Sequence, residues 1–300
     1  MIKRNSLFIG AIVAFLSCSL ASASGQQTLR QQIAAIAGNI SGKVGVYARV
    51  LETNDTVSFN HDERFPMQSV YKFPVAMAIL KQVDAGKIRL DQPIKIQKAD
   101  LTTSGHSPIR EKYPEGNVSL TVKELLDYNI CESDGSACDI FFKLLGGPAN
   151  VNRYIHGLGV KQINIATTEE AQVQKEQPMV QYKNWCTPLA MTQLLEKFYT
   201  TSALSDSSRS YLLHLMTTSG PGARRLKGLL PPGTVVAHKT GTAWTLNGQT
   251  AAHNDVGIIT LPNGNHIAIT VFVSDAKATE QERDATIAKI TKAVWDAYAG

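Results

Sequence analysis

The spacing of apolar residues changes along the chain and divides it into predicted strands and helices. Apolar and polar residues alternate in KVGVYARVLET (43–53), which is also rich in β-branched residues. This pattern predicts a strand, with the following TVSFN (56–60) as its partner. From about residue 69 to residue 214 the spacing is helical, and SVYKFPVAMAIL (69–80) is apolar on nearly every face. Such a segment is typical of a helix that is covered on all sides.

Strand patterns return in the last third of the chain, in TVVAHKTG, NDVGIITL and HIAITVFVS, and an amphipathic helix ends it. Strands near both ends with helices between them predict an α/β layer that the chain leaves and then rejoins. We therefore expect an α/β plus all-α fold, in which an antiparallel sheet flanked by helices is built from both chain ends and an all-helical domain is inserted. The α/β domain is expected to comprise residues 24–66 and 215–300, and the helical domain residues 67–214, with the active site in the cleft between them.

The first 23 residues differ from the rest. Lys3 and Arg4 precede the short apolar stretch LFIGAIVAFL, and small residues ending at Ala23 follow it. This order is typical of a secretory signal peptide, so we expect cleavage after Ala23 and a periplasmic or secreted protein without a membrane anchor. Lipid attachment at Cys18 is an alternative, although Phe15 fits a lipoprotein signal poorly.

Charge and spacing argue against several classes of protein. Loss of residues 1–23 removes Lys3 and Arg4 and no acid, so the net charge falls from +5 to +3. A mild surplus without basic blocks argues against a nucleic-acid partner. The seven histidines show neither HxH nor HExxH spacing, and GLGVKQ (157–162) lacks the third glycine of a dinucleotide loop. We therefore expect no metal and no cofactor, and the chain is expected to be a monomer.

A serine and a lysine lie three residues apart at the front of the long apolar run, as Ser69 and Lys72 of FPMQSVYK. Residues at this spacing share one face of a helix, so the two side chains can meet. The lysine can accept the serine proton if burial lowers its pKa, or it can remain a cation that eases ionisation of the serine. Taken alone the motif is weak, because about one Ser-x-x-Lys arises by chance in a chain of this composition.

Two further motifs give the pair a context. Ser133, Asp134 and Gly135 precede a predicted helix, and Lys239-Thr240-Gly241-Thr242 lies on a predicted strand. In this order, the three motifs resemble the active-site set of the class A serine β-lactamases. The runs FPMQSVYK, QYKNW, RLKGLLP and VAHKTGT are most similar to the PER/VEB-like extended-spectrum branch of that family. The resemblance implies a β-lactamase/transpeptidase-like fold, a small-molecule β-lactam substrate and hydrolysis through an acyl-enzyme.

The resemblance also implies a role for each motif residue. Ser69 attacks the lactam carbonyl, and the backbone N–H groups of Ser69 and Thr242 form the oxyanion hole. Ser133 passes a proton to the departing lactam nitrogen. Lys239, with the hydroxyls of Thr240 and Thr242, holds the substrate carboxylate, and Gly241 lies between them on the same strand.

Hydrolysis of the ester needs a second base, and the long segment 166–186 offers two adjacent glutamates. The pattern EAQVQ (170–174) favours Glu170, with Gln174 orienting the water, and Glu169 is the alternative. The deprotonation of Ser69 is assigned to either Glu170 or Lys72, and the sequence does not decide between them. Arg225 is expected to assist carboxylate binding or to be a surface charge. His106 is expected to flank the substrate or to lie on a surface loop.

Three residues depart from the family pattern. Gly135 stands where an asparagine is usual, so the amide that would contact Lys72 and the substrate is missing, and space for bulky substituents is expected instead. Gln174 replaces a more common asparagine. Pro74 removes a backbone N–H just inside the predicted catalytic helix.

Two rival functions remain. A D-Ala-D-Ala peptidase shares the three motifs but lacks the deacylating base, and a β-lactam sensor or decayed binder would form the adduct without turnover. Both predict stoichiometric acylation by a β-lactam.

Overall fold

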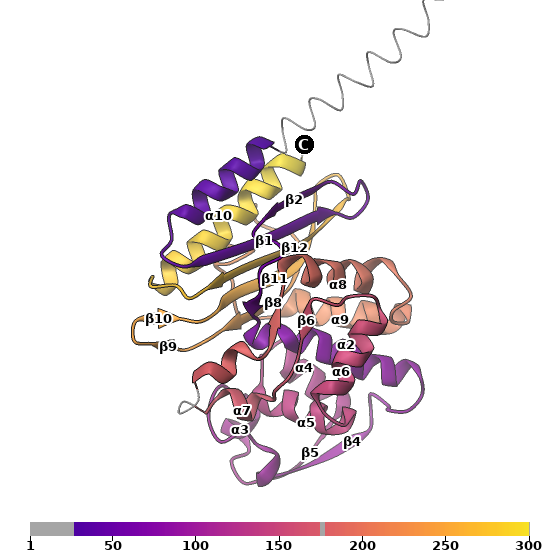
Figure 1. Cartoon of the computed structure of the whole chain (residues 1–300). Helices are drawn as coiled ribbons and strands as arrows, with labels where there is room; N and C mark the ends of the chain where they lie inside the picture. Colours follow the sequence, from indigo (N-terminus) through magenta and orange to yellow (C-terminus); the bar gives the residue numbers. More distant parts are fainter. Residues whose placement is uncertain (1–26, 175–177, 300) are drawn as a thin grey trace, which may run out of the picture.

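Five strands form one antiparallel sheet in the order β2–β1–β12–β11–β8 (Figure 1). The computed structural model describes residues 27–174 and 178–299, so the expected signal peptide lies outside the described residues. The strands are β1 (Lys43–Val50), β2 (Thr56–Phe59), β8 (Val236–Thr242), β11 (His253–Thr260) and β12 (His266–Ser274). β1 pairs with β12 from Lys43↔Ser274 to Val50↔Ile267, so the two ends of the chain share one sheet, as predicted.

Most of the helices lie between β2 and β8 in the chain. The α-helices are α2 (Lys72–Asp84), α3 (Pro108–Lys112), α4 (Val122–Ile130), α5 (Gly135–Leu145), α6 (Pro148–Gly157), α7 (Glu169–Gln172), α8 (Pro188–Thr200), α9 (Asp206–Thr218) and α10 (Glu280–Tyr298), together with a helix over residues 27–38. Short 3-10 helices are η1 (Gln68–Tyr71), η2 (Lys98–Asp100) and η3 (Pro178–Tyr182). Short strands are β3 (Phe65–Pro66), β4 (Pro93–Gln97), β5 (Gly116–Thr121), β6 (Ile163–Asn164), β7 (Trp185–Cys186), β9 (Thr245–Leu246) and β10 (Gln249–Thr250).

The two faces of the sheet are covered by different helices. α10 and the helix over residues 27–38 lie together on one face, and the remaining helices lie on the other side (Figure 1). Along β12 the side chains alternate between these layers: Ile269 and Val271 belong to the core under α10, while Phe272 belongs to the core of the helical layer. β12 is apolar on both faces because each face packs against a separate apolar layer. The exact domain boundaries stay a prediction.

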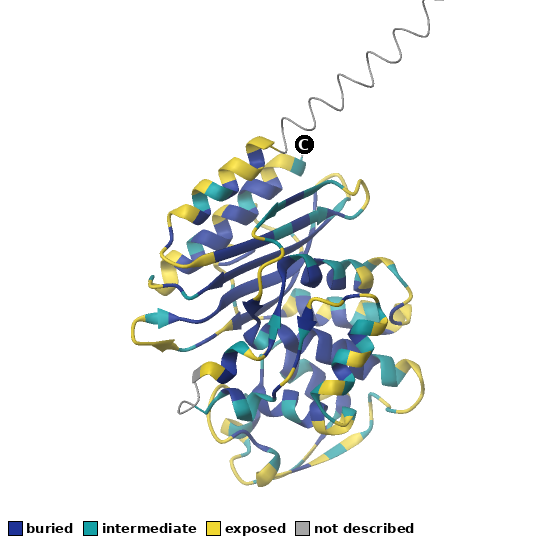
Figure 2. Ribbon diagram, in the orientation of Figure 1, coloured by how far each residue is buried: buried dark blue, intermediate teal, exposed yellow. Residues whose placement is uncertain are grey.

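α2 is the central helix of the helical layer. Its residues from Lys72 to Leu80 are all buried, and only its last turn, from Lys81 to Asp84, is partly or fully exposed (Figure 2). Pro74 fits because α2 begins only at Lys72, after the 3-10 turn η1. The proline therefore lies in the first turn, where an N–H has no intrahelical acceptor and its loss costs little.

No helix among residues 27–174 and 178–299 is both long and apolar enough to cross a bilayer.

Candidate active site

The front end of α2 brings Ser69 and Lys72 together. Ser69 lies in η1, and Lys72 Nζ donates a hydrogen bond to Ser69 Oγ at 2.8 Å. Lys72 is 1% exposed, so its ammonium is held at the hydroxyl by packing. The preceding Gln68 has a φ of 47°, a left-handed conformation that costs free energy in a residue other than glycine. Strain of this kind beside a buried lysine–serine pair is typical of a functional site.

Glu169 is the carboxylate that faces this pair. Lys72 Nζ lies 2.7 Å from Glu169 Oε1, and the Tyr71 hydroxyl donates to the same oxygen at 2.5 Å. Burial lowers the pKa of Lys72, but the charge and hydrogen bond of Glu169 together with neighbouring groups such as Asp134 outweigh this effect, and the pKa is raised overall. Of the two states considered from the sequence, the structure therefore favours the cationic lysine.

Glu170 does not reach the pair, which corrects the placement expected from EAQVQ. Its Oε2 accepts from the Thr103 backbone N–H at 2.7 Å and its Oε1 from the Thr103 hydroxyl at 2.6 Å. Gln174 donates to Glu170 at 2.8 Å, and no contact of Gln174 with Glu169 is found among the described residues. Adjacent residues of a helix point about 100° apart, so only one of two neighbouring glutamates can face Lys72.

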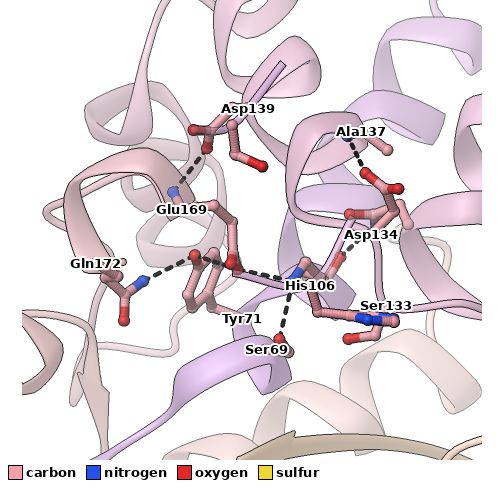
Figure 3. Close-up of polar contacts among 12 residues, drawn as sticks. Ser69, Tyr71, His106, Ser133, Asp134, Ala137, Asp139, Glu169 and Gln172 are labelled. Atoms are coloured by element: carbon pink, nitrogen blue, oxygen red, sulfur yellow. Dashed lines mark hydrogen bonds and ion pairs between the residues drawn. The ribbon is translucent and has the colours of Figure 1, made fainter. Parts of the chain in front are cut away.

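The orientation of α7 is set by contacts from distant elements. Asp139 of α5 accepts the backbone N–H groups of Glu169 at 2.7 Å and Glu170 at 2.8 Å, as Figure 3 shows for Glu169. Burial raises the pKa of Asp139 to about 6. The Thr168 side chain caps the helix by accepting from the Ala171 N–H. The buried Asn184 accepts from the two residues before Thr168, Ala166 at 2.7 Å and Thr167 at 3.0 Å, and so fixes the start of the segment.

Ser133 and Lys239 form a second serine–lysine pair. Lys239 Nζ donates to Ser133 Oγ at 2.8 Å and to the Thr240 carbonyl at 3.0 Å. Ser133 has a φ of 59°, and the next residue, Asp134, caps α5. Burial and the nearby Lys72 lower the pKa of Lys239 to about 7. A lysine in this state gains its charge readily when an anion binds beside it.

β8 is the edge strand of the sheet, and η1 packs against it. A Cβ added to Gly241 would lie 2.4 Å from the Met67 carbonyl and 3.0 Å from the Val70 backbone nitrogen. Only glycine therefore allows β8 to approach the turn that carries Ser69. Thr242 ends the strand and is exposed, while Thr240 is buried. The strand thus brings Lys239 and Thr242 to the Ser69 side of the fold.

Arg225 lies behind this strand and is 6% exposed, so the interpretation as a surface charge is wrong. Its guanidinium donates to Asp284 at 3.1 Å, to the Asn254 carbonyl at 2.9 Å and to Thr242 Oγ1 at 2.7 Å. Each of its three nitrogens has a protein partner, so Arg225 supports Thr242 rather than pointing to open space. His253 Nε2 also donates to the Asp284 carboxylate at 2.8 Å, and burial together with Arg225 lowers the pKa of His253 to about 4.

Gly135 and His106 border Glu169 and Ser133. The Gly135 N–H donates to the His106 carbonyl at 3.0 Å, and His106 Nε2 lies 2.8 Å from the Glu132 carbonyl. Figure 3 shows His106 next to Ser133. A Cβ on Gly135 would lie 3.2 Å from the His106 carbonyl and 3.5 Å from Glu169 Oε2. The room left by the missing side chain is therefore bordered by protein atoms, which limits the space expected for bulky substituents.

Sequence reasoning missed two residues of the site, Tyr71 and Asp139. The signal for Tyr71 is a hydroxyl inside an otherwise apolar buried run, and the signal for Asp139 is a single acid in the apolar ACDIFFKLL. Buried polar groups of this kind normally have hydrogen-bond partners, and both contact Glu169. No group of three or more histidine, cysteine or acidic residues in the described part of the chain is arranged to hold a metal ion.

Comparison with known proteins gives this site a family. Residues 28–298 match the family described as the beta-lactamase enzyme family. The chain is 42% identical to beta-lactamase VEB-1 of Pseudomonas aeruginosa over 86% of each chain. It is 36% identical to extended-spectrum beta-lactamase PER-1 of the same organism, over 97% of this chain and 96% of that one. A crystal structure of a beta-lactamase from Chitinophaga pinensis superposes with a TM-score of 0.87 at 49% identity, covering 90% of this chain and 99% of that one.

The sheet, the helical layer and these structural relatives define the class A β-lactamase type of fold. The chain belongs to the beta-lactamase enzyme family.

Proposed function

We propose that the protein hydrolyses β-lactam antibiotics through an acyl-enzyme on Ser69 and that it uses Glu169 as the deacylating base. The observation that carries this proposal is the position of the Lys72 ammonium, 2.8 Å from Ser69 Oγ and 2.7 Å from Glu169 Oε1. A nucleophile, a cation that stabilises its alkoxide and a carboxylate that can take a proton are thereby linked in one chain of contacts.

In the proposed acylation, Ser69 Oγ bonds to the lactam carbonyl carbon and the lactam C–N bond breaks. Because Lys72 is held as a cation, it stabilises the developing alkoxide, and Glu169 is the group that takes the proton. Ser133 gives its proton to the departing nitrogen and is reprotonated from Lys239 or Lys72. The proton that Glu169 took from Ser69 then passes back through Lys72 to replace the one the lysine gave up, so that Glu169 is again a carboxylate before deacylation. The N–H groups of Ser69 and Thr242 bind the oxyanion, each contributing about 3 kcal/mol.

In the proposed deacylation, Glu169 takes a proton from water as the water oxygen bonds to the ester carbonyl. The ester bond then breaks and Ser69 regains its proton. Lys239 and the hydroxyls of Thr240 and Thr242 hold the substrate carboxylate, with Arg225 fixing Thr242 from behind. His106 and Gly135 border the substrate, and neither Glu170 nor Gln174 has a direct role.

The protein is further proposed to act as an exported monomer after cleavage at Ala23, and to make its host resistant to β-lactams. VEB-1 and PER-1 are named as β-lactamases, PER-1 as an extended-spectrum enzyme, which supports cephalosporins as test substrates.

The experiment uses a matched pair of variants, Glu169→Gln and Glu170→Gln. Each substitution changes one carboxylate to an amide of the same size. The two positions are adjacent in the sequence, and only the direction of their side chains differs. The purified variants are mixed with the chromogenic cephalosporin nitrocefin, and turnover and intact mass are recorded. We expect Glu169→Gln to accumulate the acyl adduct and Glu170→Gln to turn over like the wild type.

The opposite pattern would restore Glu170 as the base. An adduct that accumulates in the wild type itself would replace the proposed hydrolase with a peptidase or a sensor.

A further inference from the structure

We propose that Tyr71 is a positioning residue for deacylation, because its hydroxyl fixes the Glu169 carboxylate so that one oxygen contacts Lys72 and the other stays free for water. This inference rests on the proposed function, since it assigns a task to the same carboxylate.

The phenol of Tyr71 is held from two sides. Its hydroxyl donates to Glu169 Oε1 at 2.5 Å and accepts from Gln172 Nε2 at 2.8 Å, a line of contacts visible in Figure 3. The ring is fully buried and stacks on Phe142, with 6.1 Å between ring centroids. Because Gln172 supplies the donor to the phenol oxygen, the phenol proton is directed at Glu169.

The two oxygens of Glu169 have different surroundings. Oε1 lies 2.7 Å from Lys72 Nζ and accepts a hydrogen bond from the Tyr71 hydroxyl at 2.5 Å. Among residues 27–174 and 178–299, no donor contacts Oε2, which faces the position where Gly135 has no side chain. A carboxylate oxygen has free lone pairs in that state, so Oε2 is the atom able to accept a proton from water.

Tyr71 remains a donor throughout the working pH range. Burial and the charge of Glu169 raise the pKa of Tyr71 well above its usual value. Without the phenol hydroxyl, Lys72 alone would hold Oε1, and the carboxylate could rotate about its last bond. Glu169 would then present either oxygen to water, and fewer encounters would have the geometry needed for proton transfer.

The test compares Tyr71→Phe with Tyr211→Phe as a matched control. Tyr211 donates to Asp127 at 2.8 Å between α9 and α4, so its loss removes a similar phenol–carboxylate bond outside the site. Rapid mixing with nitrocefin and intact-mass sampling give separate acylation and deacylation rates. For Tyr71→Phe we expect deacylation to slow about tenfold and acylation to change less than threefold, as for the loss of one hydrogen bond to a charged group. Tyr211→Phe should change neither rate.

A second variant, Gln172→Met, leaves the phenol in place and removes the donor that orients it. It should slow deacylation in the same direction by a smaller factor. A purely structural role for Tyr71 would lower the melting temperature or the active fraction and leave the ratio of the two rates unchanged, and that result overturns the inference. If Glu169→Gln accumulates adduct but Tyr71→Phe does not, only the inference fails. If Glu169→Gln turns over like the wild type, the proposed function fails and the inference fails with it.

Discussion

The two sides of the site each hold a buried lysine, and the pKa values of the two lysines are shifted in opposite directions. On the helix side Lys72 is paired with Glu169 and its pKa is raised. On the sheet side Lys239 Nζ donates to the Ser133 hydroxyl and the Thr240 carbonyl and has no carboxylate partner among the described residues, and its pKa is lowered to about 7. Both are almost completely buried, so the partner and not the burial decides the sign.

This difference separates two tasks. The helix side is a compensated ion pair that already holds its charges in place before substrate arrives. On the sheet side no carboxylate in the described part of the chain pairs with the lysine, and in the proposed function the substrate carboxylate supplies that negative charge. Buried ion pairs are costly to break, and an uncompensated buried cation is costly to keep. Replacing each lysine by a neutral residue should therefore change the stability of the protein in opposite directions.

The largest effect is expected from Lys72→Met and Lys239→Met, compared in stability as well as activity. Lys72→Met leaves Glu169 without its cation, so the free energy of unfolding should fall by about 3 kcal/mol. Lys239→Met removes an unpaired buried cation, so its melting temperature should equal or exceed that of the wild type. In kcat/KM we expect losses of about 10³-fold for Lys72→Met and about 10²-fold for Lys239→Met.

Thermal unfolding and nitrocefin kinetics measure both quantities on the same samples. If the two substitutions destabilised the protein equally, the charge of Lys239 would have to be balanced as well as that of Lys72. That result would contradict the proposed difference between the two lysines.

Much of this architecture could be predicted from the sequence. Alternation predicted β1, strand-like segments predicted β8, β11 and β12, and the all-apolar run predicted α2. The fold class is confirmed by the sheet and by the structural relatives. The structure also brings Lys72 to Ser69 and Lys239 to Ser133, each at 2.8 Å. The first contact follows from the three-residue spacing on one helical turn. The second joins residues 106 positions apart and was expected only from the resemblance of the motifs to the family.

The sequence pattern could not identify Glu169, rather than Glu170, as the glutamate that faces Lys72. α7 has only four residues, and its orientation depends on Asp139, which lies 30 positions earlier in the chain. Arg225 is a similar case, because its burial depends on Asp284 of α10. Contacts between elements that are distant in the sequence determine both positions, so the local sequence pattern does not predict them.

A second prediction concerns pH and has a smaller effect, about tenfold for each pH unit. The groups that act on Lys239 are Lys72, Glu169, Asp255 and Arg225, and the pKa of Lys239 in the folded protein is about 7. Its ammonium is present below that pH and is lost above it. For an anionic β-lactam, kcat/KM should therefore fall as pH rises through about 7, because kcat/KM reports the free enzyme. In kcat the fall should occur at higher pH, since a bound carboxylate stabilises the ammonium.

Stability should move in the other direction. Between about pH 7 and the ordinary lysine pKa of 10.5 the unfolded chain binds a proton that the folded chain does not, so stability rises with pH in this window. Lys239→Arg keeps its charge and should remove the fall in kcat/KM. A wild-type profile that is flat between pH 6 and 9 would contradict the lowered pKa.

The smallest expected effect comes from Gly135→Ala, which changes the helix side alone. The new Cβ would lie 3.2 Å from the His106 carbonyl, which has to give by a few tenths of an ångström, and 3.5 Å from Glu169 Oε2, which is ordinary van der Waals contact and restricts the carboxylate only slightly. A displacement of about 1 Å can cost about 100-fold, so we expect deacylation to slow only about fivefold. Binding of the substrate carboxylate by Lys239 should not change, because the nearest atoms that the added methyl group would meet belong to His106 and Glu169.

Gly157→Ala is the matched control, since a Cβ there meets no atom within 4 Å and gives α6 the same gain in helix propensity. Separate acylation and deacylation rates with nitrocefin distinguish the two variants, and the inhibition constant of a slowly reacting anionic β-lactam reports carboxylate binding. If Gly135→Ala weakened carboxylate binding as much as it slowed deacylation, the two sides of the site would act as one unit. If the deacylation rate alone changed, the position of Glu169 could be altered without affecting Lys239. This is the result expected if the helix side and the sheet side of the site have separate tasks.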